Sequence, residues 1–315
     1  MTQRFTVQAS DRRLTRLDGT LAEERANKAT LLAYYGSFAY TGLAVSSRTE
    51  ATDEMLMRAL AKEHKSADEA IRNLAIEATR TIGRLRLQGL RAYEERVARR
   101  TSFVGCGFVG LRNPVAAGRS PVFDNLHPFL AVISNAQDLS RAWRPQASPQ
   151  FGVHGAYLAE DQPFLLHEAG QPVPAALRTR TMRMIAECLR RGVHAEAVAR
   201  LLARAIREAS RTNPAVGPNV MCTFVHRENV KASTKQVISG GPIPIVPEVM
   251  AELSYFKRLR DVGPPRFIYS PGDSGELVHY GPNYAESGLQ MKGLIFGPSN
   301  LVPVPTASSP GLNRT

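Results

Sequence analysis

The stretch Ala9-Ser10-Asp11-Arg12-Arg13-Leu14-Thr15 decides the fold of this chain when it is taken together with two later stretches. These are Asn27-Lys28-Ala29 and Ala39-Tyr40-Thr41-Gly42-Leu43-Ala44. The first stretch belongs to a segment over residues 5–15 in which Phe5, Val7 and Ala9 alternate with polar neighbours, which is typical of a half-buried strand. The later two also lie in short segments rich in strand-forming residues. An acid, a lysine and a glycine therefore follow one another on three consecutive strands.

The chain around these stretches predicts antiparallel strands followed by two helices. The strands are expected over residues 5–15, 28–34 and 38–41, and Asp18-Gly19 is a tight-turn signal. Thr52 is placed to cap a helix over residues 53–61, and Ser66-Ala67-Asp68-Glu69 is a capping box for a second helix. An apolar stripe from Ile71 to Leu85 marks the buried face of that second helix, which we expect to continue toward Arg99.

Strands and helices then alternate once more in the same grouped manner. We expect strands over residues 102–111, 129–134, 151–158 and 163–167, helices over 179–191 and 194–211, and a last strand over 219–226. Grouped strands and helices favour an α+β layered domain over a doubly wound parallel sheet. That domain covers residues 1–226.

Residues 227–315 differ in composition from the rest of the chain. Pro and Gly are frequent there and the hydrophobic periodicity is weak. We interpret this part as a C-terminal extension that packs on the core, with a disordered tail over residues 306–315.

The composition is that of a globular protein without a membrane span. The 315 residues are 43% hydrophobic, and no run of about 18 apolar residues occurs. The first residues lack the apolar segment of a signal peptide. Cys106, Cys188 and Cys222 are scattered without metal-ligand spacing, which favours buried thiols in a reducing cytoplasm. The histidines show no paired metal spacing either, so we expect no metal and no cofactor.

The net charge of +12 raises the question of a nucleic-acid partner. Only seven of the 40 basic residues are Lys, and the arginines are spread along the chain. No RNP motif, zinc-finger spacing or basic heptad array occurs. Specific nucleic-acid binding is therefore not expected. A basic nucleic-acid-associated protein is kept as a third interpretation, ranked after a hydrolase and a non-catalytic interaction protein.

The order of elements and the three quoted stretches resemble the proteasome β-subunit-like family of N-terminal nucleophile (Ntn) hydrolases. The resemblance covers roughly residues 5–226 as a pattern. Within the family, the chain looks most like the actinobacterial-style proteasome-like proteins that carry a C-terminal extension. It implies a four-layer αββα sandwich and self-association into a homo-oligomer. The separations from Asp11 to Lys28 and from Lys28 to Gly42 are close to those of the family. Where the family usually places an aspartate near its last core strand, this chain has Asn219.

The resemblance implies a site that acts on a peptide or amide substrate. Lys28 would lower the barrier to deprotonating a hydroxyl nucleophile, and Asp11 would keep that lysine charged and oriented. The backbone N–H of Gly42 would stabilise the oxyanion. Arg13 and Asn219 would contact these groups and help to hold them in position, without touching the substrate. Judged as isolated residues, Asp11 and Lys28 fit an ion pair at a sheet edge, and Gly42 fits a turn.

The nucleophile itself is the missing part of this pattern. In the family a threonine begins a first strand, and the second strand carries the acid; here the strand before Asp11 is missing or truncated. Thr2 and Asp11 are nine residues apart, about 30 Å when extended, so Thr2 is a poor nucleophile. Either the natural chain begins further upstream with a Thr, Ser or Cys, or it is a non-catalytic structural or interaction protein that keeps the sandwich. Loss of the first strand would leave a sheet edge exposed unless another segment covers it.

Overall fold

The structure is a computed structural model of the chain. It describes residues 1–23, 26, 28–32, 36–47, 50–60, 67–110, 126–140, 143–193 and 195–228. It also gives the backbone of short strands between residues 284 and 302. The α+β class is confirmed, because antiparallel sheets and helices occur in separate groups along the chain.

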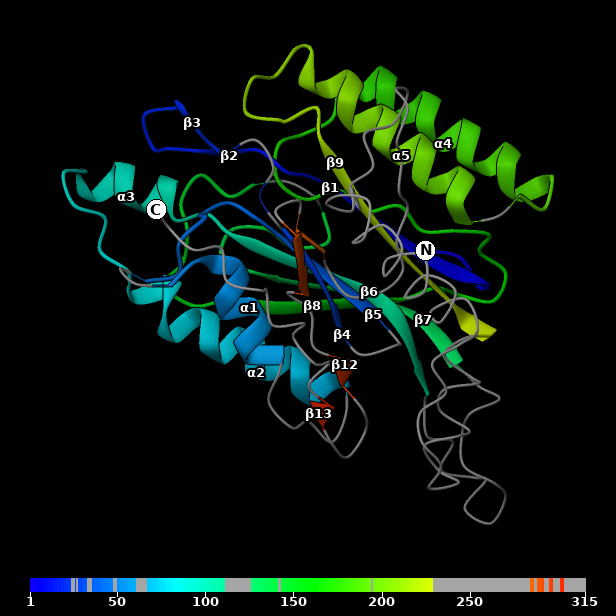
Figure 1. Ribbon diagram of the computed structural model, residues 1–315, viewed down its shortest axis with the longest axis horizontal. Helices are drawn as coiled ribbons and strands as arrows, with labels where there is room; N and C mark the ends of the chain where they lie inside the picture. Colours follow the sequence, from blue (N-terminus) through cyan, green and yellow to red (C-terminus); the bar gives the residue numbers. More distant parts are fainter. Residues whose placement is uncertain are drawn as a thin grey trace.

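Two antiparallel sheets form the centre of the molecule (Figure 1). The smaller sheet pairs β1 (Phe5–Asp11) with β9 (Val220–His226), with Phe5 opposite His226 and Asp11 opposite Val220. The larger sheet has five strands in sequence order: β4 (Ala29–Leu32), β5 (Gly36–Thr41), β6 (Ser102–Gly110), β7 (Leu126–Ser134) and β8 (Gly152–Tyr157). A short hairpin, β2 (Leu14–Thr15) with β3 (Leu21–Glu23), follows β1 and turns at Gly19.

The helices cover the outer faces of the two sheets. They are α1 (Thr52–Leu60), α2 (Ala67–Arg80), a 3-10 turn η1 (Ile82–Arg84), α3 (Ala92–Ala98), α4 (Ala175–Arg190) and α5 (Ala195–Ser210). Figure 1 shows α4 and α5 at the top, β1 and β9 beneath them, and α1 and α2 below the larger sheet. Contacts agree with this view, since α5 packs on β1 and β9, β1 packs on β5 and β6, and α2 packs on β7 and β8.

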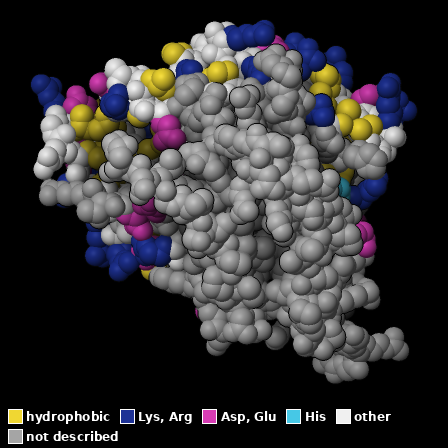
Figure 2. Space-filling view, viewed as in Figure 1, with side chains coloured by type: hydrophobic (Ala, Val, Ile, Leu, Met, Phe, Trp, Pro, Cys, Tyr) yellow, Lys and Arg dark blue, Asp and Glu magenta, His cyan; other side chains and the backbone are white. Residues whose placement is uncertain are grey.

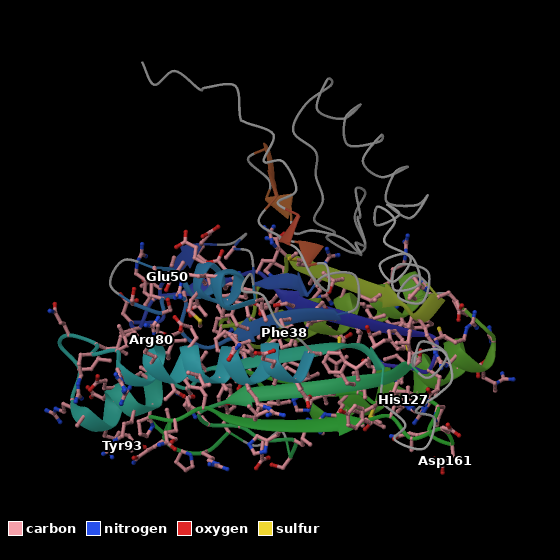
Figure 3. All side chains as sticks on the ribbon, turned by 90° about the horizontal axis from the view of Figure 1, so that it is seen from below. Phe38, Glu50, Arg80, Tyr93, His127 and Asp161 are labelled. Carbon is pink, nitrogen blue, oxygen red and sulfur yellow. The ribbon has the colours of Figure 1, made fainter. Side chains whose placement is uncertain are left out.

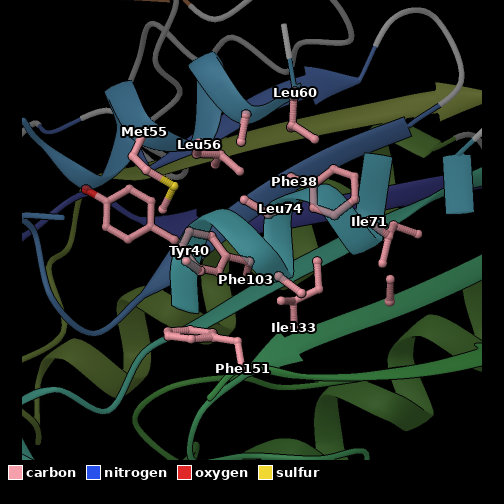
Figure 4. Packing of buried hydrophobic residues seen from close by; sticks show 14 of the residues in the cluster. Phe38, Tyr40, Met55, Leu56, Leu60, Ile71, Leu74, Phe103, Ile133 and Phe151 are labelled. Atoms are coloured by element: carbon pink, nitrogen blue, oxygen red, sulfur yellow. The ribbon is translucent and has the colours of Figure 1, made fainter. Parts of the chain in front are cut away.

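The largest hydrophobic core lies between α1, α2 and the five-stranded sheet (Figure 4). Phe38 and Phe103 point into it from neighbouring strands, and both are fully buried. The predicted stripe of α2 supplies the facing surface, with Ile71 and Leu74 buried at helical spacing. Burial of each such side chain contributes about 1.5–3 kcal/mol to the hydrophobic driving force, so this interface holds the larger sheet in place.

A second set of apolar contacts joins β1 to the helices above it. Phe5 packs with Ile185 of α4 and Val198 of α5. Val7 contacts this cluster, and with Ala9 it also contacts the small residues of α5. The odd-numbered side chains of β1 therefore face α4 and α5, and alternation directs the even-numbered ones toward the larger sheet.

Two predictions about secondary structure are wrong. The helix expected to run toward Arg99 ends at Arg80, and the chain continues as the 3-10 turn η1. Within this turn Gly83 packs so closely that a Cβ would be 2.1 Å from the Pro149 carbonyl oxygen. Gly89, with φ of +79°, then turns the chain before α3 begins. The strand expected over residues 163–167 is coil. Its first residue, Pro163, has no N–H to donate to a neighbouring strand.

The remaining boundaries differ by a few residues from the predicted ones. Helix α4 begins at Ala175, before the predicted residue 179, and β7 begins at Leu126, before the predicted 129. Most of the predicted C-terminal extension, residues 227–315, lies outside the described residues. Within it, two strand pairs are given by their backbone: β10 (Tyr284–Ala285) with β11 (Gly288–Met291), and β12 (Ile295–Phe296) with β13 (Leu301–Val302). In the described ranges no helix has the length and apolar character needed to cross a bilayer.

Candidate active site

The structure brings Asp11 and Lys28 together as a partly buried ion pair. Lys28 Nζ lies 3.1 Å from Asp11 Oδ2 and 3.3 Å from Asp11 Oδ1, so one ammonium group bridges both carboxylate oxygens. The Lys28 side chain is 9% exposed and that of Asp11 is 22% exposed. Two backbone N–H groups also donate to Asp11 Oδ2, from Arg13 at 3.1 Å and from Gly217 at 3.2 Å. The carboxylate is thus held by three donors from separate parts of the chain.

Backbone hydrogen bonds around Arg12 fix the position of this pair. Arg12 is one of the most deeply buried side chains, and its Nε donates to the Ala26 carbonyl at 3.0 Å. The Ala26 N–H in turn donates to the Arg12 carbonyl at 2.9 Å, and the Tyr40 N–H donates to the Lys28 carbonyl at 2.9 Å. The segment that carries Lys28 is therefore tied to the end of β1 on one side and to β5 on the other.

Gly42 follows β5 in a conformation that other residues rarely adopt. Its φ is +109°, and a Cβ at this position would lie 2.1 Å from the Arg100 carbonyl oxygen. The position therefore needs glycine for both its backbone angle and its close approach to a neighbouring chain. Gly42 is exposed, and in the described part of the chain no acceptor bonds to its N–H. That N–H is available to a bound oxygen atom.

Asp11, Lys28 and Gly42 line one large cavity of about 1570 Å³. The cavity runs beside β1, between the apolar faces of α4 and α5 and the inner face of the larger sheet. Its walls include Ile185 and Val198 from the helices. Ordinary small-molecule pockets hold roughly 300–1,000 Å³, so this space suits a larger ligand or a chain segment.

The two supporting residues predicted for the site differ in their placement. Arg13 lines the cavity, and its backbone N–H holds Asp11, but its side-chain Nη1 donates to the Pro214 carbonyl at 2.7 Å. The Asn219 carbonyl accepts from the Arg12 N–H at 3.0 Å. Asn219 stands next to the site through its backbone and is not among the residues lining the cavity.

Burial raises the pKa of two groups near the site: the phenol of Tyr40, whose ring lies in the core between α1, α2 and the larger sheet, and the thiol of Cys106, which lines the cavity. Burial raises the pKa of the Tyr40 phenol well above its ordinary value, with nearby acidic groups such as Asp53 adding to the shift. Burial also raises the pKa of the Cys106 thiol, and Ser37 lies within 3.7 Å of its sulfur. A thiol in this environment is a packed strand residue, and it lacks the thiolate character of a cysteine nucleophile.

No nucleophile joins the ion pair in the described part of the chain. There Lys28 Nζ contacts no side chain other than that of Asp11. The Thr2 hydroxyl donates to the Phe5 carbonyl at 2.8 Å and accepts from the Phe5 N–H. Thr2 thus precedes β1, and the strand separates it from Asp11 by about 20 Å at 3.3 Å per residue.

Sequence analysis missed several polar residues of the cavity wall. His167, Glu168 and Arg178 line it, and Arg178 Nε donates to Glu168 Oε1 at 2.8 Å. Arg100 and Trp143 also line the cavity, and the Arg100 guanidinium lies 5.5 Å from the ring centre of Trp143. These residues come from an irregular segment, a helix and a loop, so no periodic pattern in the sequence marks them as neighbours.

Among the other chemistry-bearing groups, His127 is not one of the residues that line the cavity. His127 is at the far end of the molecule from Tyr93, which lines the cavity (Figure 3). No three His, Cys, Asp or Glu side chains gather as a metal site in the residues that the structure describes. Arginine side chains follow the surface over α4 and α5, with hydrophobic side chains between them (Figure 2). Several of these arginines pair with acids on the same helices, for example Arg190 with Glu187.

Comparisons with known proteins find similarity only among solved structures. No protein-family model matches the sequence, and no curated protein is similar to it. Among solved structures, Anbu (ancestral beta-subunit) from Yersinia bercovieri is similar with a TM-score of 0.42 and 14% sequence identity. The similarity covers 71% of this chain and 78% of that chain. A likeness at this level assigns no family to the chain and carries no conclusion about its activity.

Proposed function

We propose that the chain has a proteasome-like Ntn fold, a four-layer αββα sandwich, and that its site hydrolyses peptide or amide bonds. The observation that carries the proposal is the partly buried Lys28–Asp11 pair at 3.1 Å, which shares one cavity with the exposed Gly42. The residue types, their order along the chain and their convergence at one place are those expected for this chemistry.

Each group has a role that follows from its surroundings. The Lys28 ammonium, oriented by Asp11, would stabilise the deprotonated form of a neighbouring hydroxyl or thiol. The carboxylate itself is held by the N–H groups of Arg13 and Gly217, so the lysine sits on a rigid support. The Gly42 N–H, fixed by its positive φ, would donate to the oxyanion of a tetrahedral intermediate.

The proposal requires a nucleophile within hydrogen-bond reach of Lys28 Nζ, at about 2.6–3.2 Å. The described residues supply none, and this observation favours a second candidate function. In that candidate the same fold serves as a structural or interaction protein, and the Asp11–Lys28 pair only stabilises the end of β1. Self-association as a homo-oligomer, a cytoplasmic location and a separate C-terminal extension remain proposals under both functions.

The two functions are separated by an assay of the protein isolated from its native host, with its N-terminus determined by mass spectrometry. Fluorogenic peptides would report hydrolysis, and an electrophilic peptide warhead would label a nucleophile covalently. The hydrolase proposal predicts labelling at one residue and loss of turnover in Lys28→Met by roughly 100-fold or more. Arg72→Met is the matched control, because Arg72 forms an exposed pair with Asp68 on α2.

Absence of both labelling and turnover in the native protein would reject the hydrolase and leave the interaction protein. Turnover that survives Lys28→Met while the fold is intact would reject the role assigned to this site. Folding is checked in each variant by circular dichroism and by urea denaturation.

A further inference from the structure

The hydrogen bonds that flank the pairing of β1 with β9 show which way the backbone groups of β1 point. The Arg227 N–H donates to the Arg4 carbonyl at 2.9 Å, and the Arg12 N–H donates to the Asn219 carbonyl at 3.0 Å. Both bonds fit the register in which Phe5 stands opposite His226. In an antiparallel ladder, the residues that exchange hydrogen bonds recur at every second position. The even-numbered residues of β1 therefore bond to β9.

The odd-numbered residues of β1 direct their backbone N–H and C=O groups to the opposite edge. At Phe5 both groups are bonded locally, by the Thr2 hydroxyl and the Thr2 N–H. At Val7 and Ala9, neither group has a partner within the part of the chain that the structure describes. The same holds for the N–H of Asp11. With respect to the described residues, one edge of this central strand is thus open from Val7 to Asp11, over about 13 Å at 3.3 Å per residue.

The open edge borders the large cavity and does not face bulk solvent directly. Val7, Ala9 and Asp11 all line the space of about 1570 Å³. Leu202 of α5 lines it on the helical side, and Val104 and Leu130 line it on the side of the larger sheet. A ligand there needs alternating donors and acceptors along one edge and apolar surface on both faces. An extended polypeptide segment has this combination of properties, and a strand buried on both faces is rich in Val, Ile and Leu.

We propose that this cavity is a strand-acceptor site, in which an extended apolar peptide segment of a partner protein adds to the free edge of β1. The central residues of the bound segment are uncharged, because both faces of the site are apolar. Its flanking residues are acidic, because the cavity wall has an excess of positive charge. Beyond the ion pairs of Lys28 with Asp11 and of Arg178 with Glu168, the wall carries Arg13, Arg16 and Arg100 against Asp18 and Glu94. The proposal goes beyond the hydrolase function, since it requires no bond in the peptide to break.

Strand addition makes a prediction that simple hydrophobic binding does not make. Successive N–H groups of a strand point to opposite edges, so only every second N–H of the bound peptide reaches β1. Methylation of those nitrogens removes a donor and places a methyl group against the strand edge. Methylation of the intervening nitrogens leaves the bonds to β1 intact.

The test uses the full chain and a fluorescent peptide of about seven residues with a Val- and Ile-rich centre and a glutamate at each end. Binding is followed by fluorescence anisotropy, and one backbone nitrogen is methylated at a time. We expect saturable binding that weakens roughly ten-fold or more at alternate positions and changes less than about three-fold at the positions between them. Binding that is absent, or that responds equally to methylation at every position, would overturn the proposal.

A variant of the protein gives an independent arm. Ala9→Pro removes an N–H that points into the cavity and leaves the ladder to β9 intact, as proline can do on a strand edge. It should weaken the peptide roughly ten-fold or more, whereas Arg72→Met should have no effect. Peptide binding that persists in Ala9→Pro would place the peptide elsewhere, for example on the outer edge of β8, and would overturn the proposal. A segment of the same polypeptide found in the cavity would overturn it as well.

The outcome is separable from that of the hydrolase proposal. Lys28→Met should abolish hydrolysis and retain the alternation seen on peptide methylation. Failure of the alternation alone therefore counts against the strand-acceptor site, and failure of turnover alone counts against the hydrolase.

Discussion

We predict that loss of Asp11 and loss of Lys28 lower the stability of the protein by different amounts. Asp11→Asn leaves the Lys28 ammonium, 9% exposed, without a charged partner in the described part of the chain. Lys28→Met leaves the Asp11 carboxylate with the N–H groups of Arg13 and Gly217 and with 22% of its side chain in contact with water. The first variant should therefore be the less stable of the two.

The magnitudes follow from the burial of the two side chains. Removal of one partner from a fully buried pair costs about 3–5 kcal/mol. The partial exposure of Asp11 screens this pair, so we expect Asp11→Asn to cost about 2–3 kcal/mol. Lys28→Met should cost about 1–2 kcal/mol, because the carboxylate keeps two backbone donors. The exposed pair of Arg72 and Asp68 sets the baseline, with Arg72→Met expected within about 0.5 kcal/mol of the parent.

Urea denaturation followed by far-UV circular dichroism gives these values, provided that the slope of the transition is unchanged. The double variant of Asp11→Asn and Lys28→Met closes a cycle and should show a coupling of about 1–3 kcal/mol. The reasoning is refuted if Lys28→Met costs as much as Asp11→Asn, or if both variants lie at the Arg72→Met baseline.

Three other perturbations test separate parts of the fold. Gly42 and Gly19 both have a positive φ, of +109° and +82°, but only at Gly42 would a Cβ collide with backbone atoms. Gly42→Ala should therefore lower the free energy of unfolding by about 3 kcal/mol or more, and Gly19→Ala by about 1 kcal/mol, as measured by thermal unfolding. Hydrogen bonds from Arg58 hold the pKa of Glu50 below its ordinary value. The contact therefore stabilises the protein at pH values above the pKa of the unfolded chain, and this stabilisation is lost as the pH falls through the folded pKa. Glu50→Gln should accordingly lower the urea midpoint at neutral pH, and the difference from the parent should shrink as the pH falls through the folded pKa of Glu50. Gly105→Ala would place a Cβ 2.3 Å from a buried phenyl ring of β5 and should cost about 1–3 kcal/mol, measured in the same urea experiment.

The parts of the fold with strong periodicity were predictable from the sequence. The stripe that begins at Ile71 was expected to face the core, and it packs against Phe38 and Phe103. The contact of Asp11 with Lys28 was also expected, although 17 residues separate them and the expectation rested on a resemblance. Hydrophobic patterning records which face of an element is buried, so it predicts elements better than it predicts how they meet.

The parts that could not be predicted depend on contacts between distant segments. The helix ends at Arg80 and Gly83 packs against the Pro149 carbonyl, and that proximity arises only in the folded chain. The close packing at Gly42 has the same origin, since Arg100, whose carbonyl approaches it, follows α1, α2 and α3 in the sequence. The cavity could not be predicted either. It is lined by residues from many separate segments, and no local residue pattern shows that these segments leave a space between them.

The ion pair and the open edge belong to the same strand, and this has a physical consequence. Asp11 ends β1, so a segment added along Val7 and Ala9 would extend toward its carboxylate and cover the exposed fifth of that side chain. Removal of water from the pair strengthens its electrostatic interaction. Two groups that stabilise each other in this way are thermodynamically linked, so occupancy of the cavity and the strength of the Asp11–Lys28 contact should rise together. The pair is therefore the point at which a bound strand would influence the site, whether the chain hydrolyses peptides or only binds them.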